Sequence, residues 1–313
     1  MKRVIGALFV ASLVGAVAQA QSLPAPFSSD YTLNDLGSIA GVPGPYGGIT
    51  FLNDNTLLIG GSANSGGGAI YAVSVTRDIN GNITGFGTPT LYSTAPNIDG
   101  GLAFGPGGDL FFTEFPNNAI GEIMPGDNSP DLTVSLSGNV TSSVGTLAFV
   151  PAGFNGAGNF VIGSYSGGTF CTASLTANGS GTYNIGTCSG TETTGGGPEG
   201  IIYVPSGSAD FSGEMALVSQ YSTGTVVAYG IDANGLPTGA GTTFINGLSG
   251  AEGAVLDPVT DDFLFSTFGG GNQIEEVQGF SAPIPSTPEP AAFFLMGGGL
   301  AAVIALRRRL RAC

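Results

Sequence analysis

One phrase recurs five times along the chain: a short apolar strand, a turn rich in Gly, Asp and Pro, and a second apolar strand. The five copies begin at Gly47, Gly100, Gly145, Glu199 and Glu252. Their matching apolar residues are Phe51, Phe104, Phe149, Tyr203 and Leu256, at successive spacings of 53, 45, 54 and 53 residues. Repeats of this length cannot bury their apolar faces alone, so the pattern indicates a fold made by stacking or arranging similar units.

A second landmark follows within three of the units. The segments RDINGNIT, TANGSGTY and IDANGLPT place Gly81, Gly179 and Gly235 at offsets of 33, 33 and 35 residues from matching positions of their units. Asn-Gly between β-prone runs is a strong hairpin signal, because its central positions favour a positive φ. Each unit therefore reads as four strands, which in the first unit we expect at 49–53, 56–61, 69–77 and 83–93.

Four-stranded repeats of 40 to 55 residues are typical of a β-propeller. The sequence thus predicts an all-β fold over residues 21–280, with five four-stranded blades. The fifth unit provides only three clear strands and ends near Phe280, so we expect the segment DYTLNDLGSIAG (30–41) to supply its fourth strand and close the ring. Six or seven blades remain compatible with the pattern, and the rival folds are a pair of β-sandwiches or a β-solenoid. In style the phrase resembles propellers of the gluconolactonase and NHL kind, which usually have six units.

The N-terminus has the features of a secretory signal peptide over residues 1–20. Lys2 and Arg3 form a basic region, Val4 to Val17 is apolar, and Ala18-Gln19-Ala20 is a small-x-small cleavage site. We therefore expect signal peptidase to cleave this segment and the mature chain to begin near Gln21.

The C-terminus reads as a membrane segment with a sorting signal. Residues 291–306 are free of charge, and the basic tail 307–313 that follows them contains Arg307, Arg308, Arg309 and Arg311. An arginine cluster after an apolar run stays cytoplasmic, which favours a transmembrane helix over the alternative of a buried helix. The residues 281–287 before it are proline-rich and predict a semi-rigid linker.

Pro288-Glu289-Pro290, the apolar helix and the arginine cluster together resemble the PEP-CTERM sorting signal (288–313). The resemblance implies export, transient anchoring in the bacterial inner membrane, processing by an exosortase and delivery to the cell surface or extracellular space, in bacteria that make exopolysaccharide or biofilm. It implies nothing about the activity of the sorted domain.

Charge excludes one class of partner. Between residues 22 and 289 the chain has 22 acidic residues and one basic residue, Arg77, which gives a net charge of −21. Binding to nucleic acid needs a basic surface, so we expect no nucleic-acid partner. The acidity suits solubility of an exported protein or attraction of a divalent cation.

Cysteine positions predict one disulfide. Cys171 and Cys188 flank the TANGSG hairpin at nearly equal distances from its turn, which places them opposite each other within disulfide reach. An exported protein passes through an oxidising compartment, so we expect the bond to form; two reduced buried cysteines are the alternative. Cys313 lies beyond the arginines and is expected to be unpaired.

The residue inventory excludes most catalytic sites. The chain has no histidine and the segment 21–280 has no lysine, which removes Ser-His-Asp and Cys-His nucleophiles, histidine metal sites and Schiff-base lysines. The segment that starts at Asp78 resembles a calcium loop but has Pro89 where an EF-hand requires glutamate, so the hairpin interpretation is preferred.

Three acids remain as candidates. Asp99, Glu199 and Glu252 each stand one or two residues before the first strand of a unit, where the loops of a propeller meet at one mouth of its channel. Three carboxylates from separate blades could bind Ca²⁺, whereas an acid before glycine also commonly caps a turn. We expect no other cofactor. Two of these carboxylates would support glycoside hydrolysis at a separation of about 5 to 9.5 Å.

The sequence therefore predicts an exported surface or extracellular-matrix protein with a non-enzymatic binding or structural role in biofilm or exopolysaccharide. Its partners would be exopolysaccharide or another surface protein. The alternatives are a Ca²⁺-dependent hydrolase or lactonase that uses the carboxylates at the channel mouth, and a structural protein without a ligand.

Overall fold

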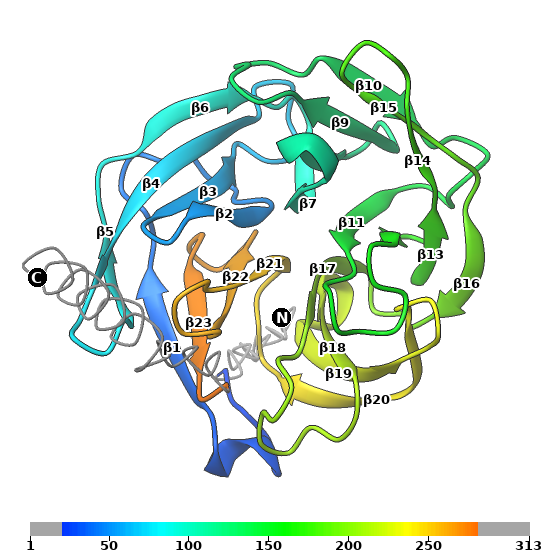
Figure 1. Cartoon of the computed structure of the whole chain (residues 1–313). Coiled ribbons are helices and arrows are strands. Elements are labelled where there is room, and N and C mark those ends of the chain that lie inside the picture. The colour runs from blue at the N-terminus through cyan, green and yellow to red at the C-terminus, as the bar shows by residue number, and fades with distance from the viewer. Residues whose placement is uncertain (1–20, 281–313) are drawn as a thin grey trace, which may run out of the picture.

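The computed structural model describes residues 21–280, which form a ring of five antiparallel sheets around a central channel (Figure 1). The predicted all-β propeller with five blades is confirmed. The predicted signal peptide, linker, transmembrane helix, sorting motif and basic tail lie outside the described residues. Within residues 21–280, no helix has the length and apolar character needed to cross a membrane.

Three blades consist of a single four-stranded sheet, in which the first strand lies at the channel and the last at the rim. Blade 2 contains β7 (Ile98–Phe104), β8 (Leu110–Glu114), β9 (Ala119–Ile123) and β10 (Leu132–Ser135). Blade 4 contains β17 (Pro198–Tyr203), β18 (Met215–Gln220), β19 (Thr225–Ile231) and β20 (Pro237–Ile245). Blade 5 contains β21 (Ala251–Leu256), β22 (Phe263–Thr267), β23 (Ile274–Gln278) and β1 (Thr32–Gly37).

The other two blades carry additional hairpin strands: one in blade 1 and two in blade 3. Blade 1 contains β2 (Ile49–Asn53), β3 (Thr56–Gly61), β4 (Ala69–Arg77) and β6 (Thr90–Thr94), with β5 (Ile83–Phe86) paired to the far end of β4. Blade 3 contains β11 (Val144–Phe149), β12 (Phe160–Ser164), β13 (Thr169–Ala173) and β16 (Ser189–Thr193), with β14 (Leu175–Ala177) and β15 (Tyr183–Ile185) as a separate hairpin.

The first three strands expected in unit 1 are confirmed, but the expected fourth strand, 83–93, is divided. Residues 83–86 extend the β4 hairpin beyond the rim, whereas Thr90–Thr94 forms the outer ladder strand of the blade (Figure 1). The interruption falls at Gly87–Pro89, where the N–H of Gly87 bonds to the carbonyl of Ser74. Proline lacks the N–H that a ladder needs, so the chain leaves one pairing and enters another.

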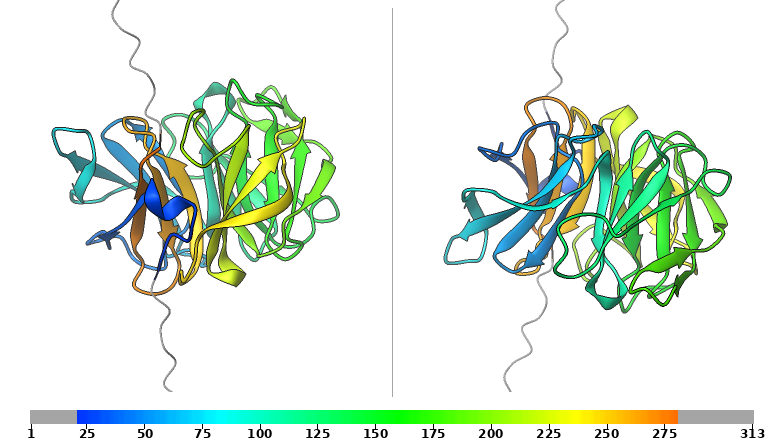
Figure 2. Two further views of the ribbon diagram at one scale, coloured as in Figure 1. Left: turned by 90° about the horizontal axis from the view of Figure 1, so that it is seen from below. Right: turned by 90° about the horizontal axis from the view of Figure 1, so that it is seen from above.

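The ring closes as the sequence predicts. Strand β1, from the N-terminal segment, pairs antiparallel with β23 over Thr32↔Gln278 to Gly37↔Ile274 and becomes the outer strand of blade 5. Figure 2 shows the ring edge-on, with this early segment lying against the last blade. Pairing strands from the two chain ends removes the open seam at which the ring would otherwise separate.

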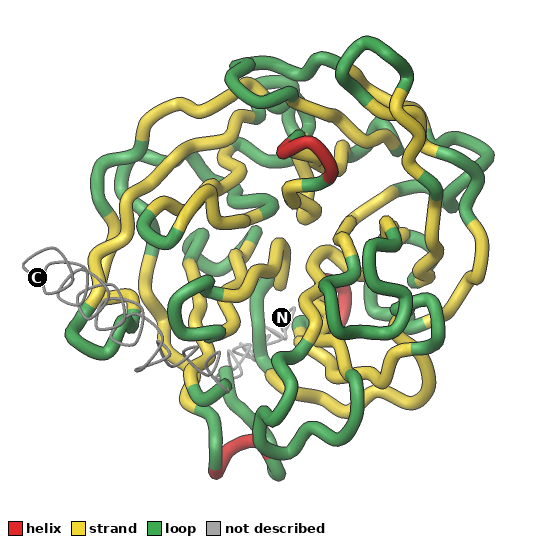
Figure 3. Tube along the Cα trace, viewed as in Figure 1, coloured by secondary structure: helices red, strands yellow, loops and turns green. Residues whose placement is uncertain are grey.

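The core is distributed over the five interfaces between neighbouring blades. The second strands are short continuous apolar runs because their alternate side chains are buried on both faces of the sheet. In β8, Phe111 packs toward blade 3 and Phe112 toward blade 1. In β22, Phe263 and Phe265 pack toward blade 4 and Leu264 toward blade 1. Helical structure within residues 21–280 is confined to three short 3₁₀ turns, η1 (Phe27–Ser29), η2 (Pro106–Gly108) and η3 (Tyr221–Thr223) (Figure 3).

Glycines let the inner strands approach closely at the channel. A Cβ on Gly100 would lie 2.2 Å from the carbonyl oxygen of Glu199, and one on Gly145 would lie 2.2 Å from the carbonyl oxygen of Pro198. Hydrogen bonds connect neighbouring blades there, among them Gly48 N–H to the Asp99 carbonyl at 2.7 Å. The space that these glycines leave sets how closely the first residues of the inner strands converge.

Candidate cation site at one mouth of the channel

The three predicted acids stand in irregular positions at the start of the inner strands. In β17 the pairing passes from Pro198↔Gln220 to Gly200↔Ser219, so Glu199 is an extra residue without a partner in the ladder. Asp99 in β7 and Glu252 in β21 lie in corresponding register shifts. A β-bulge re-aims the side chain of the extra residue, and here the three side chains line one cavity at the channel mouth.

The structure brings Asp99, Glu199 and Glu252 together. One carboxylate oxygen from each lies within 4.8 Å of the other two, although the residues belong to blades 2, 4 and 5. The side chains are almost fully buried, with exposed fractions of 2%, 4% and 1%. The predicted convergence is therefore confirmed. Metal binding itself stays a prediction.

Each of these carboxyl groups has an oxygen without a hydrogen-bond partner: Asp99 Oδ2, Glu199 Oε2 and Glu252 Oε2. Buried polar atoms are normally paired with protein, water or an ion, so three such oxygens at one cavity make it a candidate binding site. Asn64, whose Oδ1 is also buried and unpaired, lines the same cavity.

Burial changes the ionisation of the cluster. It raises the pKa of Asp99 to about 8. Hydrogen bonds from Asn64, Glu199 and the Gly100 backbone act in the opposite direction but have smaller effects on this pKa. Burial, then the negative charges of Asp99 and Glu252, hold the pKa of Glu199 well above its usual range, and burial followed by Asp99 does the same for Glu252. Arg77, the one basic side chain in residues 21–280, offers no compensation because it forms a bidentate ion pair with Asp257 at 2.6 and 2.9 Å.

The cavity above the carboxylates has a volume of about 270 Å³ and an aromatic wall. Four blades contribute the wall residues Phe115, Tyr165, Tyr221 and Phe268, each of which directly follows the second strand of its blade. We call these four residues the aromatic collar. Sequence reasoning missed the collar, although four of the five repeated phrases end in one of these aromatic residues.

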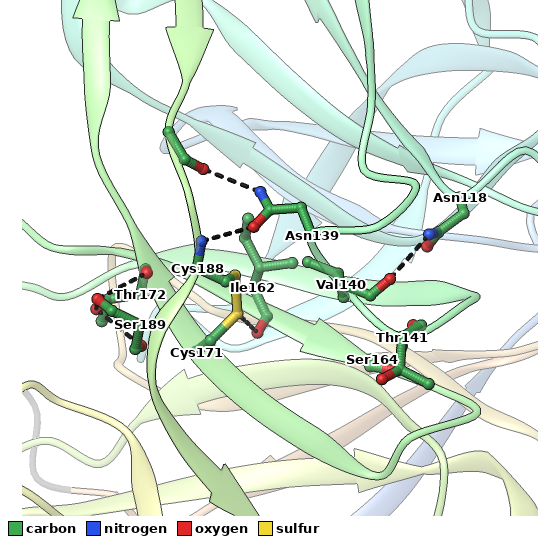
Figure 4. Close-up of a disulfide and its surroundings, with 11 residues drawn as sticks. Asn118, Asn139, Val140, Thr141, Ile162, Ser164, Cys171, Thr172, Cys188 and Ser189 are labelled. Atoms are coloured by element: carbon green, nitrogen blue, oxygen red, sulfur yellow. Dashed lines mark hydrogen bonds between the residues drawn. A yellow bond between two sulfur atoms is a disulfide. The ribbon is translucent and has the colours of Figure 1, made fainter.

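The predicted disulfide is confirmed at the rim of blade 3. Cys171 and Cys188 are bonded, with a Cα–Cα distance of 5.5 Å, and close the base of the β14–β15 hairpin (Figure 4). Their alignment differs slightly from the expected one, because the ladder pairs Thr172 with Ser189 and shifts register between Phe170 and Thr172. The Cys188 N–H donates to Asn139 Oδ1 at 2.7 Å, which ties this corner to the preceding loop. The disulfide is remote from the candidate site and has a structural role.

The Asn-Gly turns are also confirmed as hairpin turns. Gly81, Gly179 and Gly235 have φ values of 94°, 84° and 83°. Each turn is closed by a backbone hydrogen bond between its two ends, as from Asp78 N–H to the Asn82 carbonyl at 3.0 Å. The segment at Asp78 is therefore a turn between β4 and β5 and not a calcium loop.

Comparison with solved structures gives low similarities. They include a 6-phosphogluconolactonase-like protein from Bacteroides uniformis (14% identity, TM-score 0.43, 80% of this chain and 71% of that chain). A virginiamycin B lyase from Staphylococcus aureus has 16% identity and a TM-score of 0.41 over 79% of this chain and 99% of that chain. An aldose sugar dehydrogenase from Streptomyces coelicolor has 15% identity and a TM-score of 0.41 over 78% and 83%. At this level none of them assigns an activity to the present chain.

A search of curated proteins finds no match to the chain. The model of the PEP-CTERM protein-sorting motif matches residues 286–309, which include Pro288, Glu289, Pro290 and the first arginines of the tail. The chain therefore carries the PEP-CTERM sorting motif, the mark of an exported protein that is sorted to the cell surface.

Proposed function

We propose that this protein is a surface-displayed, non-enzymatic binding protein whose channel mouth holds a Ca²⁺ ion. The observation that supports the proposal most is the set of three buried carboxyl groups, each with one unpaired oxygen, that approach one another within 4.8 Å through one oxygen of each group. Three carboxyl groups confined to that space can all be charged only when a cation compensates them, and a divalent cation would supply that compensation.

The donor set favours a hard cation. Asp99, Glu199 and Glu252 offer oxygen only, and the amide oxygen of Asn64 lines the same cavity. Ca²⁺ accepts six to eight oxygen ligands in flexible geometry, so water or a bound ligand can complete its shell, whereas Mg²⁺ demands a near-ideal octahedron. Zn²⁺ favours histidine and cysteine, which are absent from the lining of this cavity.

The geometry gives less support to glycoside hydrolysis. The two carboxyl groups of a glycosidase stand about 5 to 9.5 Å apart so that sugar or water fits between them. Here the nearest carboxylate oxygens are within 4.8 Å, and all three groups face a common point. A Ca²⁺-dependent hydrolase or lactonase is the competing function, because it would use the same ion.

The direction of the mouth fits ligand binding at a surface. Inner strands begin at the carboxylate mouth, and β23 runs away from it to Gln278, two residues before the described chain ends at Phe280. The chain thus continues toward its sorting motif from the opposite face of the ring. The carboxylate mouth therefore lies on the face opposite the end of the described chain.

Calcium titration of the purified protein tests the proposal. We expect CaCl₂ to raise the melting temperature, since a ligand at 100 times its Kd adds about 2.7 kcal/mol, and MgCl₂ to act weakly. Glu199→Gln and Glu252→Gln should each remove the Ca²⁺-induced shift, measured relative to the same variant without metal. Asp127→Asn, at an exposed acid, is the matched control and should keep it.

Two results would decide against the proposal. Absence of a Ca²⁺ shift in the wild-type protein would show that the carboxylates do not bind Ca²⁺. Turnover of a lactone or ester that requires Ca²⁺ and is lost in Glu199→Gln would establish the competing enzymatic function.

A further inference from the structure

Two groups of residues with opposite chemistry line one small chamber. One is the aromatic collar, and the other is the three carboxyl groups of Asp99, Glu199 and Glu252, which we call the carboxylate floor. Four rings surround the chamber, and the three unpaired carboxylate oxygens lie at its base. In blade 1 the residue directly after the second strand is Ser62, and Asn64, two residues further along, lines the chamber. A ligand that fills this chamber must satisfy hydrogen-bond acceptors below and apolar ring faces around it.

Three of the four collar rings form a continuous row. Tyr165 and Tyr221 have their centroids 6.0 Å apart at an interplanar angle of 71°, and Tyr221 and Phe268 lie 5.9 Å apart at 79°. Edge-to-face contacts of this kind hold adjacent rings in place. The Tyr165 hydroxyl also accepts a hydrogen bond from Ser222 Oγ at 3.3 Å. The wall is therefore pre-arranged over the floor.

The floor selects for charge and for the number of donors. Three buried carboxyl groups, each with an unpaired oxygen, line one chamber and match the three N–H donors of a primary ammonium group. A quaternary ammonium has no N–H to offer and would leave all three oxygens unpaired. An anion would oppose the charged form of these carboxyl groups, and a neutral alcohol has no charge with which to stabilise it.

The wall selects for the rest of the ligand. Aromatic faces attract cations and pack against the methylene groups next to an ammonium nitrogen. The chamber of about 270 Å³ lies just below the common range of about 300 to 1,000 Å³ for small-molecule pockets, which restricts the ligand to a short chain.

We propose that the chamber binds a primary alkylammonium group, with the nitrogen on Asp99, Glu199 and Glu252 and the alkyl stem between the rings of the collar. The proposal goes beyond the Ca²⁺ site and needs no metal, because the ammonium group would occupy the position of the ion and compete with it. The ligand comes from outside the protein, since the chain's one lysine, Lys2, lies in the predicted signal peptide. Its source is either a free amine or a lysine side chain of another surface protein.

Calorimetric titration of the full-length protein in EGTA tests this directly. We expect n-butylammonium to bind, and n-butanol and butyltrimethylammonium to bind at least tenfold more weakly. Ca²⁺ should raise the apparent Kd of n-butylammonium in proportion to its concentration. Equal binding of the three probes would overturn the proposal, and so would absence of n-butylammonium binding.

Variants separate the collar from the floor. Tyr221→Leu and Phe268→Leu should each weaken n-butylammonium about three- to tenfold, as expected for loss of a cation–π contact, and leave Ca²⁺ affinity unchanged. Tyr221→Phe should restore binding because it restores the ring. Phe149→Leu, at the opposite mouth, is the matched control and should bind normally. If the leucine variants bind n-butylammonium as the wild-type protein does, the collar has no role and the proposal fails, whereas the Ca²⁺ result is unaffected.

A pair of peptides distinguishes the two sources. Acetyl-Gly-Lys-Gly-amide should bind with at least the affinity of n-butylammonium if the natural ligand is a lysine side chain, and its Nε-acetylated form should not bind. A peptide that binds more weakly than n-butylammonium assigns the chamber to a free amine. Equal binding of the acetylated and unmodified peptides would contradict recognition of the ammonium group itself.

Discussion

The two mouths of the channel are made by the same five inner strands, yet their chemistry is opposite. Where the strands begin, Asp99, Glu199 and Glu252 converge beneath the aromatic collar. Where the strands run toward the other face, a second cavity of about 380 Å³ is lined almost entirely by apolar side chains. These include the landmark residues of the repeats: Phe51, Phe104, Phe149, Tyr203 and Leu256.

The difference shows which part of a repeat is free to vary. The landmark residues at the apolar mouth are similar in all five units because they pack into neighbouring blades. The positions at the carboxylate mouth differ: three units place an acid there, whereas blade 3 has Gly145 and blade 1 has Gly47 and Gly48. Departure from the repeat, in addition to the repeat itself, therefore locates the candidate site.

The largest effect is expected at Gly145, because the lack of a side chain there lets the inner strands approach closely at the carboxylate mouth. A Cβ at Gly145 would meet the Pro198 carbonyl at 2.2 Å and Glu199 Oε2 at 2.7 Å, so Gly145→Ala should destabilise the fold by about 3 kcal/mol. Urea unfolding measures the loss. Gly230→Ala, in strand β19 with no atom within 4 Å of the added Cβ, is the control. If the two variants are equally stable, the inner strands can move apart at Gly145 without loss of folding free energy, and the prediction is wrong.

A smaller effect is expected at the apolar mouth, and there it should affect stability alone. Phe149 is half-buried and lies 4.9 Å from the Phe160 ring and 5.7 Å from the Phe111 ring. Phe149→Ala should therefore cost about 2 kcal/mol, less than a fully buried ring, and leave Ca²⁺ affinity unchanged. Urea unfolding measures the loss of stability, and calcium titration of the same sample measures the Ca²⁺ affinity. A large loss of Ca²⁺ affinity would show that the two mouths are coupled.

The smallest effect on stability is expected from the ionisation of three buried carboxyl groups outside the channel. Burial raises the pKa values of Glu122, Glu275 and Glu276 to about 7. The folded protein then binds more protons than the unfolded chain between about pH 4.5 and 7, so stability is greatest at the acid end and falls as pH rises through this window.

Melting temperatures measured from pH 5 to pH 8 in EGTA should therefore decrease by a few degrees, and the raised pKa values of Asp99, Glu199 and Glu252 act in the same direction. Glu122→Gln removes one of the groups and should make the decrease smaller, whereas Asp127→Asn should leave it unchanged. A melting temperature that rises over this range would show that these carboxylates are stabilised as anions in the folded state.

Much of the fold could be predicted from the sequence. The alternation of apolar strands with Gly-rich turns is a local property, which is why β2, β3 and β4 begin and end where expected and why β1 was identified as the closing strand. The pairing of Cys171 with Cys188 follows from the same local hairpin geometry. The division of the last strand of blade 1 was missed, because the choice between two pairings along β4 depends on neighbours on both sides.

The candidate site was predicted in part. The position of each acid before an inner strand indicated the mouth, but not the bulges that turn the three side chains toward one another. The collar residues end four of the repeated phrases, yet an aromatic residue after a strand is as typical of a blade interface as of a cavity wall.

The sequence by itself determined the number of units, the order of their strands and the sorting motif, because these depend on residues close together along the chain. Only the closed ring decided that Asp99, Glu199 and Glu252 meet within 4.8 Å, and that they do so beneath four aromatic rings. The physical reason is that radial closure converts equal positions in distant repeats into neighbours around one axis. How near those neighbours come is fixed by the glycines packed between them.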